Sequence, residues 1–135
     1  MRKALPIIGV LFAAACALVV LATARGGAAT PETVLITFHP KSGSEQPLAD
    51  VIARHWTVAR QLDLVLDAPH VTLRGTDAGG NTFFVEVLTW RSAAAPDSAP
   101  KQILDIWDEM NALVESRDGR PGLDLRAMTV LSHDR

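Results

Sequence analysis

The sequence of 135 residues has a single cysteine, and Cys16 lies inside an apolar N-terminal run. The remainder of the chain therefore has no disulfide, no thiolate metal site and no thiol nucleophile. A domain of this size without disulfides must be held together by its hydrophobic core or by a partner subunit.

Motifs for metal binding and for nucleophilic catalysis are also missing. The four histidines show neither H-x-H nor H-E-x-x-H spacing; they are His39, His55, His70 and His133. There is no G-x-S-x-G elbow, and the glycines from Gly75 to Gly80 read as a turn and not as a phosphate loop. We therefore expect neither a bound metal nor a cofactor.

A basic stripe is absent as well. Without Arg2 and Lys3, 11 of the 13 basic residues remain against 15 dispersed acidic ones, a formal balance of −4. This charge distribution argues against nucleic acid and against an anionic membrane surface as partners.

The N-terminus has the features of an export segment. Met1–Lys3 is basic, 4–24 is apolar without a charge, and Ala22-Thr23-Ala24 offers a small-residue exit. This pattern predicts a secretory signal peptide, but an apolar run of this length also suffices for a retained membrane anchor. In either case the rest of the chain is expected outside the cytoplasm, in the periplasm or secreted.

Beyond this segment we expect a linker over 25–32, one domain over 33–131 and a tail over 132–135. β-branched residues and turn signals predict four strands, at 33–39, 70–75, 83–92 and 123–131. Apolar residues at helical spacing predict two helices, at 45–62 and 100–116, with Ser44 and Ser98 as their N-caps. The order β-α-β-β-α-β is typical of the ferredoxin-like α+β fold, a four-stranded antiparallel sheet with both helices on one face.

The stretch FFVEVLTWRS, at 83–92, is apolar on both faces of its expected strand. Two helices cover only one face of a sheet, and a solvated second face would alternate with polar residues. We therefore expect the second face to be buried against another copy, giving a homodimeric α+β barrel. The sequence leaves open whether Glu86 and Trp90, which share one face, lie on the helix side or on the dimer side.

From about Val34 to Leu131 the chain resembles the antibiotic biosynthesis monooxygenase-like (ABM-like) domains of the dimeric α+β barrel superfamily. The resemblance rests on the element order, on VEVLTWRS and on IWDEMNAL in the second helix. It implies a dimer through the sheets and a pocket for hydrophobic molecules between sheet and helices. Some members oxidise quinol-like aromatics without metal or cofactor, and others degrade haem.

The haem-degrading members are a poor match at the residue level. Trp90 corresponds to their tryptophan near the end of the third strand. The first strand has Thr37 and His39 where they have an asparagine, and the second helix lacks their haem-ligating histidine. Haem degradation by that mechanism is therefore not expected.

Two ionisable residues are candidates for catalysis. His55 lies in the middle of the apolar face of the first helix, where a neutral imidazole could act as a base. Glu86 could orient it. The alternative is structural: His55 as a core histidine satisfied by a carbonyl or by Glu86, and Glu86 as the partner of Arg74 or Arg126.

Four large side chains could line a ligand pocket, or could simply form part of the core: Trp56, Trp90, Trp107 and Met110. Two functions remain open. The first is an exported monooxygenase-like oxidoreductase that acts on a small hydrophobic or aromatic molecule without a cofactor. The second is a non-catalytic binding or structural domain of the same fold.

Overall fold

The computed structural model describes residues 29–132. The predicted signal peptide or anchor, at 1–24, therefore lies outside the described residues. So do residues 25–28 of the predicted linker and residues 133–135 of the predicted tail, which include His133. Among residues 29–132, no helix is both long enough and apolar enough to cross a membrane.

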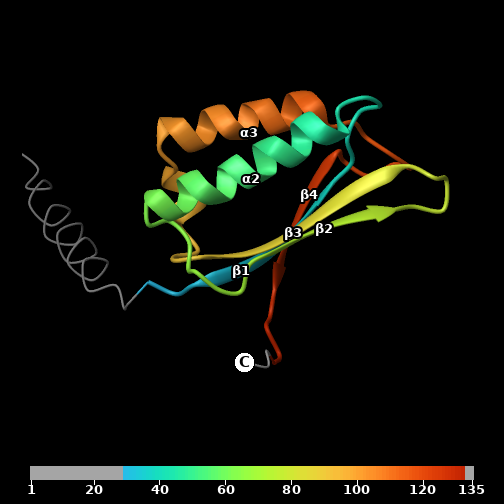
Figure 1. The fold of residues 1–135 in the computed structure, drawn as a ribbon. Coiled ribbons are helices and arrows are strands. Elements are labelled where there is room, and N and C mark those ends of the chain that lie inside the picture. The colour runs from blue at the N-terminus through green and yellow to red at the C-terminus, as the bar shows by residue number, and fades with distance from the viewer. Residues whose placement is uncertain (1–28, 133–135) are drawn as a thin grey trace, which may run out of the picture.

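The described chain forms four strands and two helices in the expected order, with one additional short 3₁₀ helix. The elements are β1 (Glu32–Phe38), α2 (Glu45–Gln61), β2 (Val71–Thr76), β3 (Thr82–Trp90), η1 (Ala95–Ser98), α3 (Lys101–Leu113) and β4 (Leu123–Met128). The strands pair antiparallel in the order β2-β3-β1-β4. Both helices lie side by side over the same face of this sheet (Figure 1). The predicted ferredoxin-like arrangement is confirmed.

The core lies between the helices and this face of the sheet. Each helix contributes its apolar stripe, since residues three and four apart share one side of a helix. The buried residues of α2 are Leu48, Val51, Ile52, His55 and Ala59, and those of α3 are Ile103, Ile106 and Met110. Alternate residues of β1 and β3 face them: Val34, Ile36, Phe38, Phe84, Glu86, Leu88 and Trp90.

The predicted second helix and last strand were too long. Val114 has extended backbone and forms an isolated bridge with Pro40, and the Glu115 N–H donates to the His39 carbonyl at 2.9 Å. This pairing ends α3 at Leu113. β4 ends at Met128, which pairs with Thr33, and β1 extends only one residue beyond that pair, to Glu32.

The predicted serine caps were wrong in their chemistry. Ser44 does occupy the N-cap position of α2, but its side chain makes no capping hydrogen bond. Ser98 belongs to η1, and its hydroxyl donates to the Ala94 carbonyl at 3.5 Å. Pro100 occupies the N-cap position of α3 instead.

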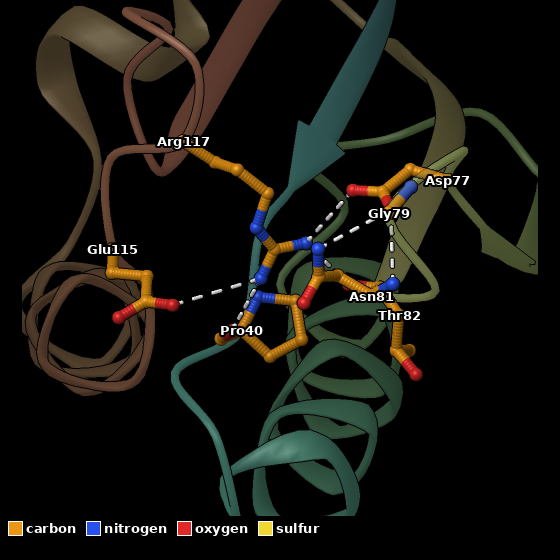
Figure 2. A network of polar contacts seen from close by, with 7 residues as sticks. All are labelled: Pro40, Asp77, Gly79, Asn81, Thr82, Glu115 and Arg117. Atoms are coloured by element: carbon orange, nitrogen blue, oxygen red, sulfur yellow. Dashed lines mark hydrogen bonds and ion pairs between the residues drawn. The ribbon is translucent and has the colours of Figure 1, made fainter.

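Arg117 ties three segments together at one end of the sheet (Figure 2). Its guanidinium donates to the Thr82 carbonyl at 2.8 Å and to the Pro40 carbonyl at 2.9 Å. Its nitrogens also lie 3.6 Å from a carboxylate oxygen of Asp77 and 3.7 Å from one of Glu115. The start of β3, the β1–α2 connection and the α3–β4 connection thus meet at a single side chain.

Candidate functional site

Strand register decides which face Glu86 and Trp90 occupy. Glu86 pairs with Ile36 on one side and with Thr72 on the other. Directly paired residues point to the same side of a sheet. Since Ile36 is in the core beneath the helices, Glu86 and Trp90 face the helices too, and both are buried. The structure therefore brings them to the side where His55 lies.

His55 lies in the middle of α2 and is 1% exposed. Its Nε2 accepts a hydrogen bond from the Trp107 indole N–H on α3 at 3.0 Å. Its ring also meets the Trp90 ring edge-on, with centroids 6.1 Å apart. The bond from Trp107 requires a lone pair on Nε2, so the neutral ring carries its proton on Nδ1.

A cavity of about 270 Å³ opens beside His55, between α3 and the β1–β4 side of the sheet. Its lining is mostly apolar and consists of Ile36, Phe38, His55, Trp90, Pro96, Trp107, Met110, Asn111, Leu123 and Leu125. Its size lies just below the range of roughly 300–1,000 Å³ that is typical of small-molecule sites. Of the six predicted site residues, the structure thus brings His55, Trp90, Trp107 and Met110 together around one cavity.

Glu86 and Trp56, the other two predicted site residues, lie outside the lining of this cavity. Trp56 stacks on His70, with centroids 3.6 Å apart and rings within 3° of parallel. Glu86 lies behind His55, with its Oε2 4.0 Å from His55 Nδ1.

The predicted arginine partners of Glu86 were wrong. Arg126 bonds Asp124, and Arg74 reaches Thr82. The Oε1 of Glu86 instead meets His70 Nε2 at 3.2 Å. His70 precedes β2, and its side chain is 21% exposed. The sequence analysis missed it because its role depends on how the segment before β2 is packed against α2.

Burial shifts the pKa values of the two innermost groups in opposite directions. Desolvation raises the pKa of Glu86 to about 8. Desolvation, with a smaller contribution from His70, lowers the pKa of His55 to about 4. The pKa of His70 is lowered by its partial burial and by Arg60 nearby. At neutral pH the site therefore holds a neutral imidazole beside a protonated carboxyl.

These shifts predict a stability plateau between about pH 4.5 and 6.5, where the opposite effects of His55 and Glu86 cancel, and a decline above it. A lowered histidine pKa contributes stability that is present above the unfolded value of 6.5 and is lost as the pH falls toward 4. The raised carboxyl pKa contributes stability that is present below 4.5 and is lost as the pH rises toward 8. Between pH 6.5 and 8, of these two groups only Glu86 changes the stability with pH. The free energy of unfolding should therefore fall by about 1.4 kcal/mol per pH unit.

Urea unfolding at several pH values tests this prediction. Glu86→Gln, a neutral isostere of the protonated carboxyl, should remove the decline above pH 6.5. Glu109→Gln, at an exposed carboxylate on α3, should retain it. An equal decline in the wild type and in Glu86→Gln would contradict the assignment.

A second cavity, of about 330 Å³, lies just beyond the C-terminal end of β1, beside His39 and Arg117. Arg117 already donates to two carbonyls there, whereas the buried Nδ1 of His39 has no hydrogen-bond partner within residues 29–132. Over residues 29–132, no three His, Cys, Asp or Glu residues gather in an arrangement that could hold a metal ion.

No family model and no curated protein sequence matches this chain. Solved structures do match it. SnoaB, a cofactor-independent oxygenase from Streptomyces nogalater, is 19% identical with a TM-score of 0.58, over 78% of this chain and 97% of its own. An antibiotic biosynthesis monooxygenase is 16% identical with a TM-score of 0.56, over 75% of this chain and 99% of its own.

A third match is a dimeric ferredoxin-like protein of unknown function from Jannaschia sp. CCS1. It is 15% identical with a TM-score of 0.54, over 75% of this chain and all of its own. At identities of 15–19%, what these structures share with the chain is the fold. The chain has the ferredoxin-like fold of the antibiotic biosynthesis monooxygenase-like proteins.

Proposed function

We propose that the domain binds a small aromatic molecule in the cavity beside His55 and oxidises it with molecular oxygen, without a cofactor. The observation that carries the proposal is the chemistry of the lining. A mostly apolar cavity places a buried neutral imidazole among two indole rings. The indole N–H of Trp90 is buried and, within residues 29–132, has no hydrogen-bond partner. A ligand oxygen would satisfy it.

The chemistry requires one base and an electron-rich substrate. In an anthrone-type phenol, removal of a proton by His55 leaves an anion that can donate electrons to oxygen. The substrate methylene becomes a carbonyl, one oxygen atom enters the product, and the other leaves as water with the two methylene hydrogens. The substrate supplies all the electrons, so the protein needs only to bind it, remove the proton and exclude water.

Trp107 blocks the nitrogen of His55 that would act as the base. Its indole N–H occupies the lone pair of His55 Nε2, so the indole must release that bond before Nε2 can accept a substrate proton. The same bond favours the second candidate function, a binding domain without catalysis. In that case His55 and Trp107 only shape the cavity.

Oxygen uptake in the presence of quinols and anthrones distinguishes the two functions. If His55 is the base, His55→Ala should lower the rate by about 10²- to 10⁴-fold, the usual contribution of general-base catalysis. His39→Ala, at a histidine outside this cavity, should leave the rate unchanged. Ligand binding without oxygen uptake by the wild type would support the binding domain, and an unchanged rate in His55→Ala would exclude His55 as the base.

We also propose that the domain is a homodimer formed through the outer face of its sheet and that it acts outside the cytoplasm. The first proposal is supported by the apolar residues of that face and by the dimeric ferredoxin-like protein with the same fold. The second is supported by the export pattern of the N-terminal sequence.

A further inference from the structure

We propose that His55, Glu86 and His70 form a proton relay that connects the cavity to solvent at His70, beside the edge strand β2. The proposal deepens the proposed function, since the relay would serve His55 as the base. Its central claim, proton exchange between a buried imidazole and water through Glu86 and His70, can be tested without any substrate.

The three side chains come from three segments and stand in a row. His55 lies on α2, Glu86 on β3, and His70 just before β2. The two carboxyl oxygens of Glu86 point to different histidines: Oε1 is 3.2 Å from His70 Nε2, and Oε2 is 4.0 Å from His55 Nδ1. A carboxyl with one oxygen toward each imidazole has the arrangement that a proton carrier requires.

Solvent reaches only one end of this row. The side chains of His55 and Glu86 are 1% and 0% exposed, whereas that of His70 is 21% exposed. A proton taken up by His55 in an apolar cavity has no direct path to water. The row through Glu86 supplies one, away from the space that a ligand would fill.

The exposed end is held in a defined position. His70 is stacked on Trp56 of α2, and the Arg60 guanidinium lies 5.8 Å from the centroid of the Trp56 ring. Arg60 is in turn bonded to Asp67. Among the described residues, the charged or titratable groups that act on His70 are Glu86, Arg60 and His55, and Asp67 holds Arg60 in place. The positive charge of Arg60 disfavours a lasting imidazolium at His70, so a proton arriving there is passed on.

One proton enters the row and one leaves it. Nε2 of His55 takes the substrate proton, and Nδ1 passes its own proton to Glu86. Glu86 delivers the proton of its other oxygen to His70 Nε2, and His70 releases its Nδ1 proton to water. All three side chains end neutral, and the negative charge stays on the substrate anion. The 4.0 Å gap must contract to hydrogen-bond distance, about 3 Å, for the first transfer, and contacts of this kind often tighten when a ligand binds.

Two variants interrupt the relay without emptying the core. His70→Phe retains a flat ring against Trp56 but removes the proton acceptor. Glu86→Gln retains the shape of the protonated carboxyl but cannot shuttle a proton. His39→Phe, at a histidine without a contact to Glu86, is the matched control.

The first measurement is the rate at which the His55 Nδ1 proton exchanges with water, followed by NMR on protein labelled with ¹⁵N in its imidazoles. We expect at least a tenfold slowing in both variants, no further slowing in the double variant because both block one path, and no change in His39→Phe. Exchange at the wild-type rate in His70→Phe or in Glu86→Gln would overturn the relay, whatever the activity. Slowed exchange in a protein that consumes no oxygen would support the relay and refute the proposed function.

The second measurement applies once oxygen uptake is established. His70→Phe should lower kcat about tenfold or more with KM unchanged, because His70 does not line the cavity. Added imidazole should restore part of the loss by carrying protons in place of His70. A lowered rate that imidazole does not restore, together with unslowed exchange, would reduce His70 to a structural partner of Glu86.

Discussion

Replacing Arg117 with alanine is expected to destabilise the domain by about 3–6 kcal/mol, since two hydrogen bonds from a charged donor are worth about 1.5–3 kcal/mol each. The Arg117 side chain is only 13% exposed, and it satisfies the Thr82 and Pro40 carbonyls. Without the guanidinium both carbonyls lose their charged partner. For a domain of about 100 residues this loss corresponds to a Tm lower by roughly 12 °C or more.

The turn that carries Arg117 makes a matched control available. Arg117 and Arg120 exchange two backbone hydrogen bonds of 3.0 Å, across Asp118 and Gly119, both of which have positive φ. Arg120→Ala removes an exposed arginine from the same turn and should change the free energy of unfolding by no more than about 0.5 kcal/mol. Arg117→Lys should fall between the two, because an ammonium is a point charge that cannot fork to both carbonyls.

Thermal and urea unfolding of the three variants measures this difference. Equal losses in Arg117→Ala and Arg120→Ala would show that the network in Figure 2 contributes little. A further check is Asp77→Ala. Its Oδ1 accepts the backbone N–H groups of Gly79 and Asn81, so the loss of these bonds should loosen the β2–β3 hairpin that Arg117 holds.

Val87→Lys is expected to convert a dimer into a monomer. Val87 lies in the middle of the outer sheet face, where Leu35 pairs with it from β1 and Val71 from β2. Leu73, on the same face, is 56% exposed. Two-fold symmetry would bury two ammonium groups in an apolar interface. If each buried ammonium group costs about 3 kcal/mol of binding free energy, the dissociation constant of the dimer should rise by roughly 10⁴-fold.

Light scattering at micromolar concentration measures the effect directly. The wild-type domain should have the mass of a dimer and Val87→Lys the mass of a monomer. Gln61→Lys adds the same charge at an exposed position on α2 and should remain a dimer. A monomeric wild type would rule out the sheet-to-sheet interface and leave the apolar outer face unexplained.

Hydropathy patterns were sufficient to predict the element order. Apolar residues at helical spacing in α2 and α3, and β-branched runs bounded by turns, are local signals, and both helices and all four strands formed where these signals lie. Element ends were less predictable. α3 ends at Leu113 because Val114 pairs with Pro40, and such long-range pairing has no local signal.

The sequence by itself therefore determined the fold class, the residues that share a face with His55 on α2, and the fact that Glu86 and Trp90 share a face of β3. Only the tertiary structure decided that this face lies beneath the helices, because alternation along a strand does not reveal which side is covered. It also gave Glu86 a histidine partner in place of an arginine, and it placed Trp56 against His70 and away from the cavity. These contacts join segments far apart in sequence, and their geometry depends on how the segment before β2 packs against α2.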